Sequence, residues 1–169
     1  MLRRSFLQSL PFMGFLFEAK TPSNKETMAF FGDEKYIIVD GEVVCKMDKY
    51  CKKHFLNGEL HRENGPAIEY ASGGEEWFLN GKKHRVDGPA AVDSFGNKYW
   101  YFDNKLHRVD GPAIEGANGT KAWWQHGNLH REDGPAIESL YEYKEWYLNG
   151  VPQYAKIAKH NQSRRTNRQ

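Results

Sequence analysis

The chain has 169 residues, of which 39 % are hydrophobic and 27 % charged, and its formal net charge is +2. This length suits one domain, and the near-neutral charge excludes a strongly basic surface over the whole molecule. Composition departs from the average in one respect, because 14 % of the residues are Phe, Trp or Tyr.

Residues 1–29 read as an N-terminal arm. Arg3-Arg4-Ser5-Phe6-Leu7-Gln8 resembles a twin-arginine export motif and is followed by the apolar run 10–17. This run is far shorter than the roughly 20 residues that cross a bilayer, so no transmembrane span is predicted. Cleavage after Ala19 would leave Phe17 where a small residue is needed. A packed or disordered arm is therefore favoured, and an export signal is the alternative.

Residues 30–53 are interpreted as a degenerate N-terminal cap. Asp40-Gly41 and Val43-Val44 look like half a repeat unit with one inserted residue, as expected where a unit has one neighbour only. On one strand Cys45 and Cys51 would lie about 20 Å apart, whereas a three-residue loop at 47–49 would place them opposite each other. Two reduced thiols are the favoured interpretation. A disulfide would support export.

Residues 54–153 repeat with a period of 23. A His-Arg heptapeptide that ends in Gly-Pro-Ala begins at His61, His84, His107 and His130. Two aromatic series keep the same period, one at His54, Trp77, Trp100, Trp123 and Trp146, and one at Phe55, Phe78, Tyr101, Trp124 and Tyr147. A fixed period of this length indicates that each copy is one supersecondary unit that buries its apolar face against its neighbours.

Turn signals divide each unit into two or three strands of three to five residues. Asn80-Gly81 and its equivalents favour a two-residue hairpin turn with positive φ. The Gly-Pro of the heptapeptide ends the strand that follows this turn and contains His-Arg, because proline has no N–H to donate to a neighbouring strand. A third turn, such as Gly73-Gly74, precedes each aromatic strand.

A hairpin at Asn80-Gly81 pairs Trp77 with His84 and Phe78 with Lys83. Because side chains alternate along a strand, the Trp–His pairs form one stripe. The Phe/Tyr/Trp series forms the other, together with Leu60, Leu106 and Leu129. Burying one ring is worth roughly 2–3 kcal/mol. The predicted fold is therefore all-β, an elongated single-layer antiparallel hairpin sheet held by stacked rings.

Residues 154–169 complete the chain with a predicted short capping helix and a basic tail. Val151-Pro152-Gln153 replaces the His-Arg strand, and Pro152 blocks further pairing. The helix is predicted over 154–160, with disorder beyond Asn161. The last fourteen residues contain no acid and five bases, so the rest of the chain has a net charge of −3; the bases are Lys156, Lys159, Arg164, Arg165 and Arg168.

The repeated histidines and arginines are the candidate binding residues. Successive copies of His61, His84, His107 and His130 would lie roughly 10 Å apart, too far to share a metal ion whose ligands bind at about 2 Å. No metal and no cofactor is predicted. Each histidine is expected to pack on tryptophan and bond to a turn. Arg62, Arg85, Arg108 and Arg131 are each followed by Asn or Asp two residues later, which favours a brace for the Gly-Pro turn. The alternative is a line of guanidinium groups that binds an acidic partner or phosphates.

Over residues 40–150 the unit Gly-x-x-x-Trp-x-x-Asn-Gly-x-x-His-Arg-x-Asp-Gly-Pro-Ala resembles a variant of the MORN repeat found in phage, large-virus and bacterial proteins. Classical MORN units carry Gly where this chain has Arg62 and its equivalents, so the lipid-binding and scaffolding roles of some classical members do not follow. The resemblance implies a protein that is encoded by a phage or virus.

No catalytic motif is present in the sequence, neither a Gly-x-Ser-x-Gly elbow nor a phosphate-binding loop, and the repeated Asp-Gly-Pro acids are turn residues. The sequence thus predicts a non-enzymatic module that binds a protein partner, in the host cytoplasm. An exported or envelope-associated structural protein is the alternative, with membrane contact weakly supported. Nucleic acid is disfavoured as a partner by the near-neutral charge.

Overall fold

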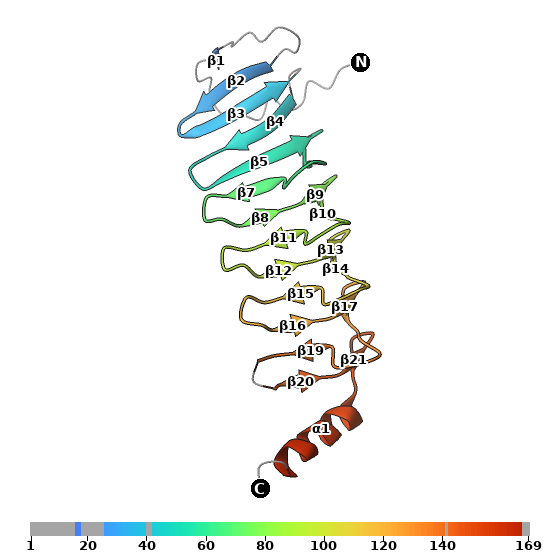
Figure 1. The fold of residues 1–169 in the computed structure, drawn as a ribbon. Helices are drawn as coiled ribbons and strands as arrows, with labels where there is room; N and C mark the ends of the chain where they lie inside the picture. The colour runs from blue at the N-terminus through green and yellow to red at the C-terminus, as the bar shows by residue number, and fades with distance from the viewer. Residues whose placement is uncertain (1–15, 18–25, 40–41, 141, 167–169) are drawn as a thin grey trace.

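The computed structural model describes residues 16–17, 26–39, 42–140 and 142–166. In these residues the chain forms an elongated antiparallel sheet of 14 strands in hairpin order, followed by one helix (Figure 1). Successive units add to the sheet along its length and no second layer covers them. The predicted all-β, single-layer hairpin architecture is confirmed.

The N-terminal cap is the most regular part of the sheet. It consists of β1 (Leu16–Phe17), β2 (Glu26–Phe31), β3 (Glu34–Val39), β4 (Glu42–Met47) and β5 (Cys51–Leu56), each paired with the next. The β3–β4 register shifts between Ile37, which pairs with Cys45, and Ile38, which pairs with Val43. Val44 is therefore the extra residue of a β-bulge. Apart from 16–17 and 26–29, the N-terminal arm lies outside the described residues.

The two cysteines are not opposite each other. The β4–β5 register pairs Cys45 with His54 and Met47 with Lys52, whereas a three-residue loop at 47–49 would pair Cys45 with Cys51. Asp48 fixes the loop between β4 and β5, since its carboxylate accepts hydrogen bonds from the Tyr50 and Cys51 amides at 2.7 and 2.8 Å. Side chains alternate along β5, so the Cys45 and Cys51 thiols lie on opposite faces of the sheet, and both are free.

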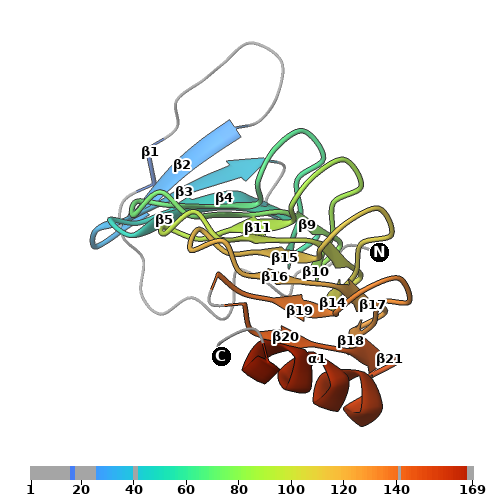
Figure 2. The ribbon, with the colours of Figure 1, turned by 60° about the horizontal axis from the view of Figure 1, so that its bottom comes forward.

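Each repeat unit contributes two strands to the main sheet and two to a side hairpin. The main-sheet strands are β7 (Ile68–Tyr70), β8 (Glu75–Glu76), β11 (Ala91–Val92), β12 (Lys98–Tyr99), β15 (Ile114–Glu115), β16 (Lys121–Ala122), β19 (Ile137–Glu138) and β20 (Lys144–Glu145). The side strands are β6 (Glu59–Leu60), β9 (Phe78–Leu79), β10 (Lys82–Lys83), β13 (Tyr101–Phe102), β14 (Lys105–Leu106), β17 (Trp124–Gln125), β18 (Asn128–Leu129), β21 (Tyr147–Leu148) and β22 (Val151–Pro152). The side hairpins lie along one long edge of the main sheet (Figures 1 and 2).

The strands of the repeats are shorter than predicted, mostly two residues long. The repeated tryptophan lies where the chain passes from a main strand to a side strand. Trp77, between β8 and β9, donates its backbone N–H to the Ala90 carbonyl at 2.7 Å. The predicted pairing within the hairpin is nevertheless correct. Phe78 pairs with Lys83 and Leu79 with Lys82, and the His84 amide donates to the Trp77 carbonyl at 3.2 Å.

The hairpin turns adopt the predicted conformation. Asn80 has φ of 48° and Gly81 of 72°, and Asp103 and Asn104 have φ of 48° and 64°. Two successive residues with positive φ define the type I′ turn, which matches the twist of the strands. These positions are therefore Asn, Asp, His or Gly in every unit.

The predicted ring stack is wrong. In the described part of the chain no close ring pair joins two members of either aromatic series. Between Phe78 and Tyr101 there is a lysine instead. Lys83 Nζ lies 5.8 Å from the centre of the Phe78 ring and 5.5 Å from that of Tyr101. The units are about two strand spacings apart, too far for direct stacking of their rings. The fully buried groups are instead the small alanines of the heptapeptide, each 0 % exposed: Ala67, Ala90, Ala113 and Ala136.

The C-terminal end of the sheet is covered by α1 (Tyr154–Thr166). The helix continues to Thr166. The prediction of a helix over 154–160 with disorder beyond Asn161 is therefore wrong. The His160 ring packs on Trp146 with 5.2 Å between ring centres. Strand β22 takes the place of the His-Arg strand as predicted, and the Gln153 amide donates to the Trp146 carbonyl at 2.8 Å. Within the described residues, no helix is both long and apolar enough to cross a membrane.

Candidate functional site

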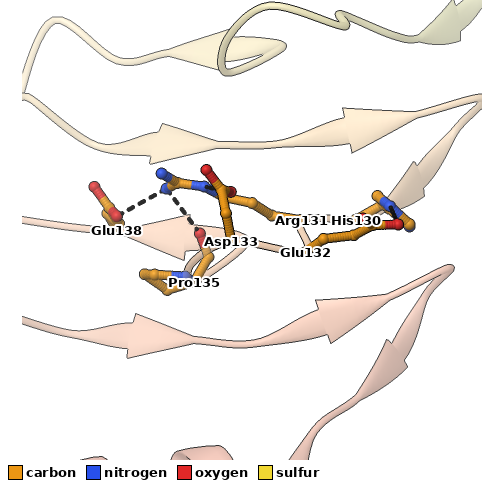
Figure 3. Close-up of polar contacts among 6 residues, drawn as sticks. All are labelled: His130, Arg131, Glu132, Asp133, Pro135 and Glu138. Carbon is orange, nitrogen blue, oxygen red and sulfur yellow. Dashed lines mark hydrogen bonds and ion pairs between the residues drawn. The ribbon is translucent and has the colours of Figure 1, made fainter.

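The repeated arginine is the centre of each unit's polar network. Arg131 lies flat against Trp123, with Cζ 3.9 Å from the ring centre. Its Nε donates to Asp133 at 2.9 Å, and its Nη1 donates to the Pro135 carbonyl at 3.2 Å and to Glu138 at 3.0 Å (Figure 3). One planar guanidinium thus links a ring, a turn and a strand, as its fork of fixed donors allows.

The other units share this arrangement with small differences. Arg108 stacks on Trp100 at 4.2 Å and its Nη1 donates to the Pro112 carbonyl and to Glu115. Arg85 stacks on Trp77, also at 4.2 Å. In the first unit His54 replaces the tryptophan, and Arg62 keeps its bonds to the Pro66 carbonyl and to Glu69.

The glycine of the Gly-Pro turn is required by this guanidinium. A Cβ on Gly111 would lie 2.9 Å from Arg108 Cζ, and the same contact at Gly65, Gly88 and Gly134 would measure 2.9–3.0 Å. A larger residue would displace the guanidinium, which at Gly88, Gly111 and Gly134 is the one stacked on tryptophan. The arginines therefore brace the turns of their own units, which the Asp two residues later had suggested. The tryptophan and glutamate contacts were missed, because they depend on pairing between strands.

The repeated histidines connect one unit to the next. Nδ1 of His107 accepts the backbone N–H of His126, in the following unit's hairpin turn, at 3.1 Å. Nδ1 of His61 and of His130 lies 2.9 and 2.8 Å from Oδ1 of Asn80 and Asn149, and 3.1–3.2 Å from the backbone N of the same residues. Nδ1 of His84 lies 3.0 Å from an Asp103 carboxylate oxygen and must donate there. The expected bond to a turn is confirmed, but the turn belongs to the next unit. The close ring contacts of His84 and His107 are with Phe102 and His126, not with tryptophan as expected.

The electrostatics of the units follow from these contacts. The hydrogen bond from Arg131 lowers the pKa of Asp133, and the one from Arg85 lowers the pKa of Asp87. Burial lowers the pKa of His107, and the neighbouring His126, whose ring centre is 4.4 Å away, lowers it further. Burial also lowers the pKa of His54, with the charge of Arg62 adding to the effect.

Large apolar side chains are exposed along the long edge of the sheet opposite the side hairpins. We call this the turn edge and define it by Tyr50, Phe95, Leu140 and Tyr143, which are 66 %, 81 %, 69 % and 50 % exposed. They occupy the turns β4–β5, β11–β12 and β19–β20, which line one edge in Figure 1. The sequence signal for them was weak. Phe95 stands where other units have Ser72 or Asn118, and Leu140 stands where they have Ala71, Ser94 or Ala117.

No protein-family model matches the chain, and a search of curated proteins finds no relative. The repeated antiparallel hairpin sheet is compatible with a MORN-like fold. Among the described residues, no group of three or more His, Cys, Asp or Glu side chains comes together in a way that could hold a metal ion.

Proposed function

We propose that this protein is a non-enzymatic module that binds a protein partner through its turn edge. The observation that carries the proposal is the exposure of Phe95, Leu140 and Tyr50 on three turns of a rigid sheet. Aromatic residues are enriched at interfaces because they supply a large apolar contact with little loss of side-chain entropy. These three turns are every second turn of the edge, so an extended partner would contact them at separate points.

The repeated histidines and arginines remain candidate contact residues away from this edge, since the histidines bond to the hairpin turns of the opposite edge. Their donors are largely used within the sheet, which favours contact through the turn edge first. The origin of the protein in a phage or virus and its place in the host cytoplasm stay predictions. An intact Met1 in the mature protein would support the cytoplasmic role, and a chain that starts near Lys20 would support export.

The first prediction tests the turn edge with two matched double variants. Phe95→Ser with Leu140→Ser should abolish capture of a specific polypeptide from host lysate, because it removes the two most exposed apolar side chains of the edge. Val86→Ser with Val109→Ser is the control, since these side chains are 85 % and 78 % exposed on the Gly-Pro loops instead. The control should retain capture, and neither pair should change the melting temperature. Equal loss of capture in both variants would contradict the proposal.

A further inference from the structure

One of the four arginines lacks a partner that the others have. Nη1 of Arg62, Arg108 and Arg131 donates to a glutamate seven residues later, at 2.6, 2.9 and 3.0 Å. Seven residues after Arg85 the sequence has Val92. In the described part of the chain Arg85 Nη1 donates to the Pro89 carbonyl at 3.3 Å and to no carboxylate.

Arg85 is otherwise held as its equivalents are. Its Cζ lies 4.2 Å from the centre of the Trp77 ring, and its Nε donates to Asp87 at 3.1 Å. The guanidinium is therefore preorganised, and little side-chain entropy remains to be lost on binding. Its side chain is 27 % exposed, so a partner can reach it.

Charges of both signs surround Val92, so the anion is favoured by the geometry of the other units and not by net charge. Val92 pairs with Lys98 on one side, and the Lys98 side chain is exposed. On the other side it pairs with Glu75, which carries the opposing charge. Asp87 is already bound to Arg85 Nε. In two other units the glutamate at this position is flanked by lysines, Glu115 by Lys98 and Lys121, and Glu138 by Lys121 and Lys144.

We propose that Arg85, Val92 and Lys98 form a subsite for the carboxylate of an Asp or Glu side chain from the protein partner. The other units show the geometry, because there a carboxylate of the chain itself takes this position. The same hairpin carries Phe95 at its tip, 81 % exposed. A partner segment with an apolar residue and a nearby acid would fit both. The inference rests on the proposed function for the existence of a protein partner.

The second prediction uses acetylated hexaglutamate as the probe, at low ionic strength because salt weakens exposed ion pairs. In the full-length protein, titration should shift the Arg85 Nε–Hε signal in nitrogen-15 NMR more than the Arg108 and Arg131 signals. Hexaglutamine should shift none of them. Val92→Glu supplies the internal carboxylate, so it should weaken hexaglutamate binding about tenfold.

Val109→Glu is the matched control, because it adds the same charge on an exposed loop and should weaken binding far less. Glu75→Gln removes the opposing charge and should strengthen binding. Equal shifts of all the arginines, unchanged affinity in Val92→Glu, or tighter binding of inorganic phosphate than of the peptide would overturn the subsite. The hexaglutamate titration needs no protein partner, so its result is independent of the capture experiment. The subsite can be refuted while capture through the turn edge succeeds, and capture can fail while hexaglutamate still binds at Arg85.

Discussion

At the scale of single residues, the contacts of the repeated arginine explain more of the residues that recur in each unit than the aromatic rings do. A guanidinium stacked on tryptophan and bonded to a turn carbonyl satisfies its donors without a buried lone charge. The arginine also explains three other residues that recur from unit to unit: the glycine against the guanidinium, the Asp two residues after the arginine, and the tryptophan eight residues before it. Trp77, Trp100 and Trp123 all carry such an arginine.

The third prediction concerns pH and His107. Its pKa is lowered in the folded protein, so the unfolded chain binds the proton first as the pH falls. The contribution of neutral His107 to the free energy of unfolding is therefore complete above the pKa of the unfolded chain, about 6.5. This contribution declines as the pH falls from there towards the pKa of the folded protein. Protonation also destroys the Nδ1 acceptor for the His126 amide, now 3.1 Å away.

The measurement is the free energy of unfolding by denaturant between pH 7.5 and 5. His126→Asn is the informative variant, because Asn80 and Asn149 occupy this position in other units and the hairpin turn is kept. It removes the second imidazole, so the loss of stability on acidification should be smaller than in the wild type. An identical pH dependence in both proteins would show that the pair does not couple.

At the scale of elements, α1 closes the array. Trp146 has Tyr154, not arginine, eight residues later, and His160 of the helix packs on its ring instead. The helix also lies next to β20, the last strand of the main sheet. A terminal unit with an uncovered edge strand would expose unpaired backbone groups, which promote association.

The fourth prediction removes this cap. A chain that stops after Gln153 should melt at a lower temperature and self-associate in sedimentation experiments, because Trp146 and the β20 edge lose their cover. Deletion of residues 167–169 alone is the control and should leave both properties unchanged. A truncated protein that stays monomeric with an unaltered melting temperature would show that the helix does not protect the edge.

At the scale of the whole molecule, stability is a sum of contacts between neighbouring units. Each main strand pairs with the next unit, and each histidine bonds to the following turn, so units in the middle of the array have two neighbours. Such arrays behave as nearest-neighbour systems, in which an internal unit contributes more than a terminal one.

The fifth prediction compares ring deletions along the array. Trp100→Ala removes the surface on which Arg108 stacks and should cost about 3 kcal/mol of unfolding free energy, the lower end for such deletions because the ring is half-buried. Phe55→Ala, near the N-terminal cap, should cost less. Chemical denaturation measures both. Equal, small losses would show that the units do not stabilise one another.

The sequence by itself determined the period, the hairpin turns and the pairing within each hairpin. These features depend on local backbone chemistry: positive φ at Asn80-Gly81, the missing N–H of Pro89, and alternation of side chains. It also favoured the brace at Arg85, Arg108 and Arg131 over a line of binding groups, because the acid lies only two residues away.

Tertiary structure decided what depends on contacts between distant segments. The loop that Asp48 fixes separates Cys45 from Cys51, and only the β4–β5 register shows it. The lysine between the Phe78 and Tyr101 rings, and the bond from each of Arg62, Arg108 and Arg131 to a glutamate, follow from how strands and units pack. A period in the sequence places equivalent residues on one face, but the distance between units and the side chains that fill it are set by packing.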